Sequence, residues 1–216
     1  MSARERVLGN VRHRLGRGDA ASTEADERLA GRAHGPLPAR SAGTGPVLRE
    51  RFVEMARAAS AEVEVLEGLP ALPALVARLC AEHGFAGPAV VAPTPPLQSL
   101  AWATGARGAE FRRAHAEDRL CVSHALCGIA ETGTVCLASG PDSPITLNFL
   151  PDVQVIALDA GTIVGAYEQA WGLLRTRGPL PRAVNWITGP SRSADIEQTL
   201  QLGAHGPVRL VLALYG

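Results

Sequence analysis

Three short loops in the second half of the chain combine small residues with side chains that could do chemistry. They are AETGT at residues 130–134, TGPSRS at residues 188–193 and GAHGP at residues 203–207. Their glycines would let the backbone approach a ligand closely. Each loop also holds a charged or titratable group: Glu131 as acid, base or nucleophile, Arg192 as a fork for a carboxylate, and His205 as a group that titrates near neutrality. We therefore expect a site for a small carboxylate or phosphate where these loops meet.

Two of these loops also have a purely structural interpretation. The sequence Thr132-Gly133-Thr134 suits a tight turn in which the glycine supplies a positive φ. Ser191 and its neighbours suit the start of a helix over residues 193–203, because a hydroxyl there accepts a bond from a free N–H group of the first turn. The same N–H groups and the positive end of the helix dipole would also attract an anion. The sequence alone leaves both interpretations open.

The charged residues around this predicted helix have alternatives of their own. Asp195 lies in its first turn, where the carboxylate would compete with an incoming anion. Arg192 could be a solvated surface residue. His205 follows the helix stop at Gly203, a place where a histidine commonly bonds to the last carbonyl groups.

Composition excludes several kinds of chemistry. All 21 Lys or Arg residues of the 216-residue chain are arginine, which excludes a Schiff-base lysine and the lysine of a phosphate-binding P-loop. The formal net charge is zero, so we expect no nucleic acid partner. No G-x-G-x-x-G stretch occurs, and a dinucleotide cofactor is therefore disfavoured.

The cysteines do not form a metal-binding pattern. Cys80, Cys121, Cys127 and Cys136 have neither zinc-ribbon nor iron–sulfur spacing, and their apolar neighbours favour buried, reduced thiols. We expect no metal and no cofactor in this chain. The amino-terminal stretch is charged where a secretory signal is apolar, and no apolar run approaches the roughly 20 residues of a membrane span. A cytoplasmic protein without membrane insertion is expected.

The chain divides into an arm and a domain. Helical spacing of apolar residues predicts a short amphipathic helix over residues 7–15. Residues 16–46 are rich in Gly, Ala, Pro and polar residues, and we expect an irregular linker or wrapping arm there. The predicted units are 1–46, an amino-terminal helix with a flexible or wrapping arm, and 47–216, an α/β domain.

Strands and helices alternate through the second unit. Short apolar runs predict strands over 62–66, 89–92, 153–158, 183–188 and 208–214, with extended pieces in 120–139. Helical spacing predicts helices over 47–59, 71–84, 96–106, 165–175 and 193–203. This order indicates a mainly parallel sheet with helices on both faces. Ligands of such sheets bind at the carboxyl ends of the strands, where we place TGPSRS.

Four motifs in this order resemble one family. They are GIAETGTVCL, LPDVQVIAL, ITGPSRSADIE and GAHGP, and they resemble the lactate-utilisation C proteins, the stand-alone members of the LUD-domain family. The resemblance covers about residues 47–216. It implies a three-layer Rossmann-like fold shared with ribose-5-phosphate isomerases, glucosamine-phosphate deaminases and CoA transferases. It also implies a role in bacterial oxidation of L-lactate to pyruvate, together with two iron–sulfur partner proteins.

The motif positions carry the predicted site. Glu131 and His205 are the candidate catalytic residues. The candidate ligand-binding residues are Thr132, Gly133, Thr134, Gly189, Pro190, Ser191, Arg192, Ser193, Asp195 and Gly206. The chain departs from the family pattern in having Ser193 where Thr is usual, Gln154 where a His is common, and no Arg ahead of Leu150.

Three functions remain open on the sequence. The first is a subunit of an L-lactate oxidation system that binds a small anion in its loops. The second is a stand-alone isomerase-like or transferase-like enzyme with Glu131 as base or nucleophile. The third is a non-catalytic assembly or regulatory subunit.

Overall fold

The computed structural model describes residues 2–16, 19–31, 35–103, 108–194, 200–202 and 206–216. The chain separates into two compact units, residues 1–37 and residues 38–216. Each unit is described by itself.

The amino-terminal unit contains two helices. In α1 (Ala3–Leu15), Ser2 and Glu5 form a reciprocal capping box and Gly16 ends the helix in the left-handed conformation. The second helix, α2 (Asp19–Gly31), lies within the stretch expected to be irregular, so that expectation was wrong for these residues. Alanine has the highest helix propensity, and a Glu24–Arg28 pair joins successive turns of α2.

The segment after residue 37 lies on its own domain. Residues Ala39–Ser41 form a 3₁₀ turn in which Ser41 is buried. The guanidinium of Arg51 donates to the carbonyls of Arg40 and Ala42. These bonds fix the beginning of the second unit, where the sequence suggested a flexible arm.

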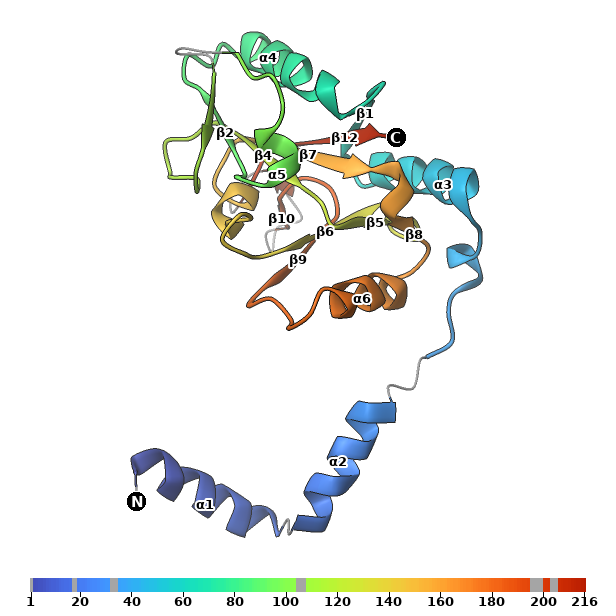
Figure 1. Cartoon of the computed structure of the whole chain (residues 1–216), viewed down its shortest axis with the longest axis vertical. Coiled ribbons are helices and arrows are strands. Elements are labelled where there is room, and N and C mark those ends of the chain that lie inside the picture. Colours follow the sequence, from blue (N-terminus) through green and yellow to red (C-terminus); the bar gives the residue numbers. More distant parts are fainter. Residues whose placement is uncertain (1, 17–18, 32–34, 104–107, 195–199, 203–205) are drawn as a thin grey trace. The chain divides into compact units, whose positions relative to one another are not determined.

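A six-stranded parallel sheet forms the centre of the second unit (Figure 1). In spatial order the strands are β1 (Glu62–Val65), β12 (Arg209–Tyr215), β7 (Val153–Asp159), β4 (Leu120–His124), β2 (Ala89–Val91) and β3 (Ala109–Phe111). Every neighbouring pair is parallel. In the register, Val155 of β7 lies opposite Val122 of β4 and Val211 of β12. The predicted α/β sheet is confirmed, and β3 is a strand that was not predicted.

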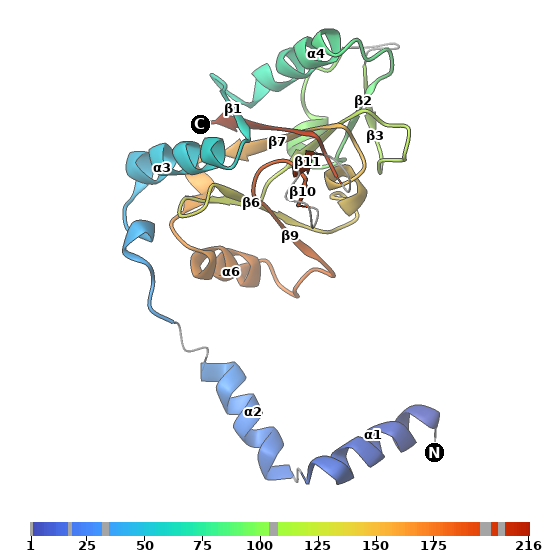
Figure 2. The same ribbon diagram turned by 180° about the vertical axis from the view of Figure 1, so that it is seen from behind.

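Both faces of this sheet are covered (Figures 1 and 2). Alternate residues of a strand point to opposite faces. Val155 and Ala157 of β7 pack in the core that contains α4 (Leu72–Glu82), whereas Ile156 and Leu158 pack in the core that contains α3 (Gly45–Ala58). Burial on both faces explains why β7 is an almost continuous apolar run.

A second, four-stranded sheet lies beyond the α3 core. Its spatial order is β8 (Ile163–Val164), β5 (Cys127–Ile129), β6 (Thr134–Ala138) and β9 (Val184–Ile187). Helix α6 (Tyr167–Thr176) packs against it, with Trp171 and Tyr167 edge-on to Trp186. The prediction that residues 183–188 join the central sheet was wrong. An apolar run indicates a strand but not its partner, and β9 pairs antiparallel with β6.

Two predicted helices differ from the structure. Of the one expected over 96–106, the described residues 96–103 contain a single turn, α5 (Pro95–Gln98), because the Trp102 indole takes the Leu97 carbonyl that a further turn would use; residues 104–106 lie outside the described residues. The one expected over 193–203 is contradicted by an antiparallel hairpin of β10 (Arg192–Ala194) and β11 (Leu200–Leu202). Residues 195–199 lie outside the described residues. No helix cap is therefore present at Ser191.

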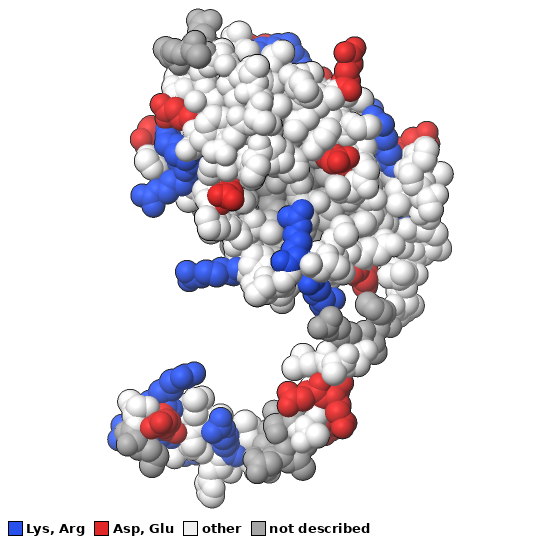
Figure 3. All heavy atoms as spheres, in the orientation of Figure 1, with Lys and Arg blue, Asp and Glu red and all other residues white. Residues whose placement is uncertain are grey.

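Surface properties of the described residues are unremarkable. The face drawn in Figure 3 carries positive and negative side chains that are scattered over the surface. None of the described helices combines the length and apolarity needed to cross a bilayer.

Three further 3₁₀ turns occur among the described residues, at Leu69–Ala71, Ile145–Asn148 and Ala160–Thr162.

Candidate functional site

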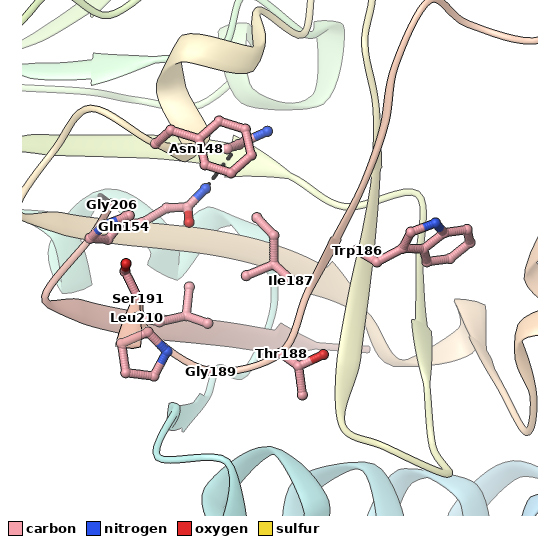
Figure 4. A pocket seen from close by; sticks show the side chains of 12 residues that line it. Asn148, Gln154, Trp186, Ile187, Thr188, Gly189, Ser191, Gly206 and Leu210 are labelled. Carbon is pink, nitrogen blue, oxygen red and sulfur yellow. Dashed lines mark hydrogen bonds between the residues drawn. The ribbon is translucent and has the colours of Figure 1, made fainter. Parts of the chain in front are cut away.

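The TGPSRS loop forms one wall of a small pocket, here called the loop pocket. Its volume is about 210 Å³. Residues 186–191 and 206–207 line it, together with Asn148, Phe149, Gln154 and Leu210. Figure 4 shows how these side chains gather between β7, β12 and the chain that leaves β9.

The loop pocket lies at the amino-terminal edge of the central sheet. Gln154 and Leu210 are the second residues of β7 and β12, and residues 206–207 lead into β12. The expectation that TGPSRS lies at the carboxyl ends of the central strands was therefore wrong. The reason is that β9, the strand before TGPSRS, belongs to the second sheet. Its carboxyl end therefore does not have to lie at the edge where the central strands end.

Two buried amides, Asn148 and Gln154, form the floor of the loop pocket, and Ser123 holds them from behind as the third member of a polar trio. The Oδ1 atom of Asn148 accepts hydrogen bonds from Ser123 Oγ at 3.0 Å and from Gln154 Nε2 at 2.9 Å. All three side chains are almost completely buried. Because both bonds end on Oδ1, they fix which way the Asn148 amide points. Gln154, the departure from the family pattern, thus orients a neighbouring side chain.

Ser191 is held against the segment that precedes β12. Its backbone N–H donates to the carbonyl of Pro207 at 2.9 Å. A Cβ added to Gly206 would lie 3.1 Å from Ser191 Cβ, so only glycine fits there without a shift. In Figure 4 the Ser191 hydroxyl points toward Gln154 and Gly206. Thr188 and Ser191 both line the pocket, and of their two hydroxyls that of Thr188 is bonded to Thr134.

The TGT loop reaches the TGPSRS loop through hydroxyl groups. Thr134 Oγ1 lies 2.6 Å from Thr188 Oγ1, 2.7 Å from Thr132 Oγ1 and 2.9 Å from the Tyr167 hydroxyl. Thr134 is completely buried, so these partners replace the water that its hydroxyl loses on folding. The network joins two of the three predicted loops.

Thr134→Val should lower the free energy of unfolding by about 1–2 kcal/mol, because a shape-preserving change leaves the Thr188 and Tyr167 hydroxyls without their shared partner. Urea denaturation measures this loss. Thr176→Val is the control, since Thr176 is exposed and its hydroxyl bonds only to a carbonyl of its own helix. Equal stabilities of the two variants would contradict a structural role for the network.

Both loop glycines pack against the end of α3. A Cβ on Gly133 would lie 2.1 Å from the backbone nitrogen of Ala56, and a Cβ on Gly189 would lie 2.0 Å from the carbonyl oxygen of Ala59. Arg192 donates to the same Ala59 oxygen at 2.9 Å. The close approach expected of these glycines is therefore made to a helix, and the Arg192 guanidinium covers that helix end.

Glu131 is buried beneath the segment that begins the second unit. Its Oε2 atom lies 3.7 Å from Arg40 Nε and makes no hydrogen bond to the described residues. The backbone N–H of Glu131 donates to the carbonyl of Gly165. Gly165 in turn packs closely against the Ser41 carbonyl. Glu131 is not among the described residues that line the loop pocket.

The predicted site residues on and after the TGPSRS loop fall into three groups. Gly189, Pro190, Ser191 and Gly206 line the loop pocket. Ser193 lies in β10 opposite Gln201. Asp195 and His205 lie outside the described residues, so their predicted roles remain predictions.

Sequence reasoning did not place several residues that line the loop pocket. The most important are Asn148 and Gln154. Gln154 is a single amide inside the apolar run VQVIAL, and a buried polar group needs a hydrogen-bond partner. This was the one feature of the sequence that indicated the pocket floor. Asn148 carried no such signal.

Comparisons with known proteins place this fold and these loops in a family. The LUD domain family model matches residues 49–215. A lactate utilization protein C from Anoxybacillus flavithermus is 44% identical over 81 residues, which are 38% of this chain and 36% of that protein. A lactate utilization protein C from Bacillus licheniformis is 33% identical over 112 residues, 50% of this chain and 46% of that protein. The chain thus spans less than half the length of these curated relatives.

A solved structure shares the fold. A DUF162 family protein from Deinococcus radiodurans superposes with a TM-score of 0.60 at 19% identity, covering 81% of this chain and all of that one. The family match extends over all strands of the central sheet. The chain belongs to the LUD domain family.

Proposed function

We propose that this chain serves L-lactate utilisation as a subunit of a system that oxidises L-lactate to pyruvate with iron–sulfur partner proteins. The observation that carries the proposal is that Gly189, Pro190, Ser191 and Gly206 line one pocket. These residues belong to the motifs through which the chain resembles the lactate-utilisation C proteins, and relatives that bear that name match it.

The loop pocket suits a small ligand with a carboxylate and a hydroxyl. About 210 Å³ is less than the roughly 300 Å³ at which pockets for drug-sized molecules begin. None of the described lining residues is ionisable, so recognition would depend on hydrogen bonds. The Ser191 hydroxyl and the Asn148 amide supply donors, and a carboxylate is stabilised by such bonds. A 2-hydroxy acid or 2-oxo acid fits this lining.

The positions of the cysteines support partners that carry the electrons. Cys121 lies in the α4 core, whereas Cys127 and Cys136 lie opposite one another in the second sheet. An iron–sulfur cluster is usually held by four cysteines that converge on one point. Cysteines in two different cores favour redox centres on other subunits.

Ser191→Ala should weaken binding of L-lactate or pyruvate about threefold to tenfold, because one hydrogen bond is worth about 1 kcal/mol. Isothermal titration of the purified chain measures the dissociation constant. The melting temperature should stay unchanged, since the hydroxyl makes no hydrogen bond to the described residues. Ser99→Ala is the matched control, because Ser99 is exposed and lies outside the pocket.

The role in the complex needs its own test. Lactate-dependent reduction of an electron acceptor should require this chain together with the iron–sulfur subunits. Undiminished activity of those subunits without this chain would contradict the proposal, as would an unchanged affinity of the Ser191→Ala variant for a ligand that binds the wild type.

One observation favours the stand-alone enzyme as a second candidate. The buried Glu131 carboxylate has an oxygen, Oε2, without a hydrogen bond among the described residues, so this acceptor is left for a substrate. Turnover of a small substrate by the purified chain alone would support this candidate over the subunit.

A further inference from the structure

A second pocket lies at the opposite edge of the central sheet and is here called the carboxyl-edge pocket. Its volume is about 340 Å³. The residues that line it are 94–96 after β2, 124–126 at the end of β4, Ala138, 140–143, and Arg177. No motif from the sequence contributes to it.

The order of the strands singles out this edge. From β2 the chain passes to β3 on one side, and then returns to β4 on the other side of β2 before continuing to β7. The direction of winding therefore reverses between β2 and β4. In open parallel sheets, ligands bind outside the carboxyl ends of the strands at such a reversal. The carboxyl-edge pocket occupies this position.

The pocket contains a cation without a partner. Arg177 is exposed and forms no ion pair with any described residue. It follows α6, and its backbone N–H donates to the Leu174 carbonyl, which fixes the base of the side chain. The carboxylate of Asp142 also lines the pocket, from an exposed loop. A guanidinium that has no ion-pair partner is free to bind an oxyanion.

Two neutral polar groups stand beside this cation. The Thr94 hydroxyl oxygen is buried and has no hydrogen-bond partner among the described residues. Such a group costs free energy unless a ligand or water satisfies it. The ring of His124 is half-buried, and its Nε2 atom lies 2.8 Å from the Tyr215 hydroxyl. Thr94 and His124 both line the same cavity as Arg177.

Burial favours the neutral form of the His124 ring. Burial lowers the pKa of His124, the carboxylate of Asp159 opposes this effect, and the nearby Arg177 adds a smaller lowering. Asp142 lines the same pocket from the opposite loop. The imidazole is therefore neutral near pH 7 in the free protein, and an anion placed beside it would raise the pKa.

We propose that the carboxyl-edge pocket is a second binding site, for a small oxyanion that is either a carboxylate or a phosphate. Arg177 pairs with the anion, and Thr94 and His124 supply hydrogen bonds. The site is separate from the loop pocket and does not depend on the proposed role in lactate utilisation.

The test is isothermal titration of the full chain at low ionic strength with two probes, pyruvate and inorganic phosphate. At least one probe should bind the wild type saturably, and the stronger one identifies the class of anion. Arg177→Gln should weaken that probe about tenfold or more, because a charge-assisted contact is lost. Arg175→Gln is the control: it removes the same charge from the same segment, stands outside the pocket, and should change the affinity less than about twofold.

The outcomes separate the two pockets. A binding event that Ser191→Ala leaves intact and Arg177→Gln weakens supports a second site, whether or not Ser191→Ala weakens a separate event at the loop pocket. Absence of saturable binding of both probes to the wild type overturns it. Loss of all saturable binding in Ser191→Ala with normal binding in Arg177→Gln also overturns it, and assigns the anion to the loop pocket instead.

The imidazole gives an independent readout. The pKa of His124, followed by NMR of its ring proton, should rise when the bound probe is saturating. The affinity for pyruvate should therefore increase as the pH falls from the raised pKa of the complex to the lower pKa of the free protein. His124→Gln should flatten this pH dependence. A pKa of His124 that does not change on saturation would overturn its placement beside the anion.

Discussion

Gly133→Ala should lower the free energy of unfolding by about 3–5 kcal/mol, a large share of the stability of a domain of this size. The new Cβ would lie 2.1 Å from the backbone nitrogen of Ala56, an atom that cannot move without disturbing α3. The φ of Gly133 is +65°, a conformation that side chains with a Cβ rarely adopt. Strain and overlap therefore act together.

Gly189→Ala should lower the free energy of unfolding by a similar amount. The new Cβ would lie 2.0 Å from the Ala59 carbonyl oxygen, and the φ of Gly189 is +74°. The control is Gly172→Ala in α6, where nothing lies within 4 Å and φ is not positive. That change should raise stability by about 0.5–1 kcal/mol. Urea denaturation with an unchanged slope measures all three. Loop variants as stable as the wild type would show that these loops are not packed on α3.

Asn148→Leu should lower the free energy of unfolding by about 2–4 kcal/mol. The change leaves the buried Ser123 hydroxyl and the buried Gln154 amide without their acceptor, and each unsatisfied group costs about 1–3 kcal/mol. Thermal and urea denaturation measure the loss. The loop pocket should also lose its ligand, because its floor loses the oriented amide.

The chain offers a matched control for this variant. The Nδ2 atom of Asn185 in β9 is buried and has no hydrogen-bond partner among the described residues. Asn185→Leu removes that unsatisfied donor and should be neutral or stabilising by up to about 1 kcal/mol. If both variants lost the same stability, the cost would come from the leucine and not from the broken trio.

The strands and helices that were predicted well share a physical cause. Runs such as the one in β7 are apolar because both faces are buried, and α3 and α4 show apolar residues at helical spacing. These signals are local. The partner of a strand is not local, which is why β9 was placed in the wrong sheet.

The candidate site was predicted in part for a related reason. Small residues correctly indicated a close backbone approach at Gly133 and Gly189, but composition cannot say whether a ligand or a helix is approached. Arg192, predicted to pair with an anion, donates one hydrogen bond to the Ala59 carbonyl, and its role toward a ligand stays a prediction. The pocket floor depends on Asn148, whose importance arises from a partner on a distant strand.

Two consecutive residues of β4 connect the edges of the sheet. Ser123 bonds to the floor of the loop pocket, and His124 lines the carboxyl-edge pocket. Their side chains leave the strand in opposite directions, so two ligands could occupy the protein at once without touching the same atoms. Any shift of this strand caused by the first ligand would be transmitted to the second, and thermodynamic reciprocity requires the cooperativity to be equal in both directions. A molecule bound at one edge would then act on the other as a mixed inhibitor or activator, and raising the concentration of the second ligand would not abolish its effect.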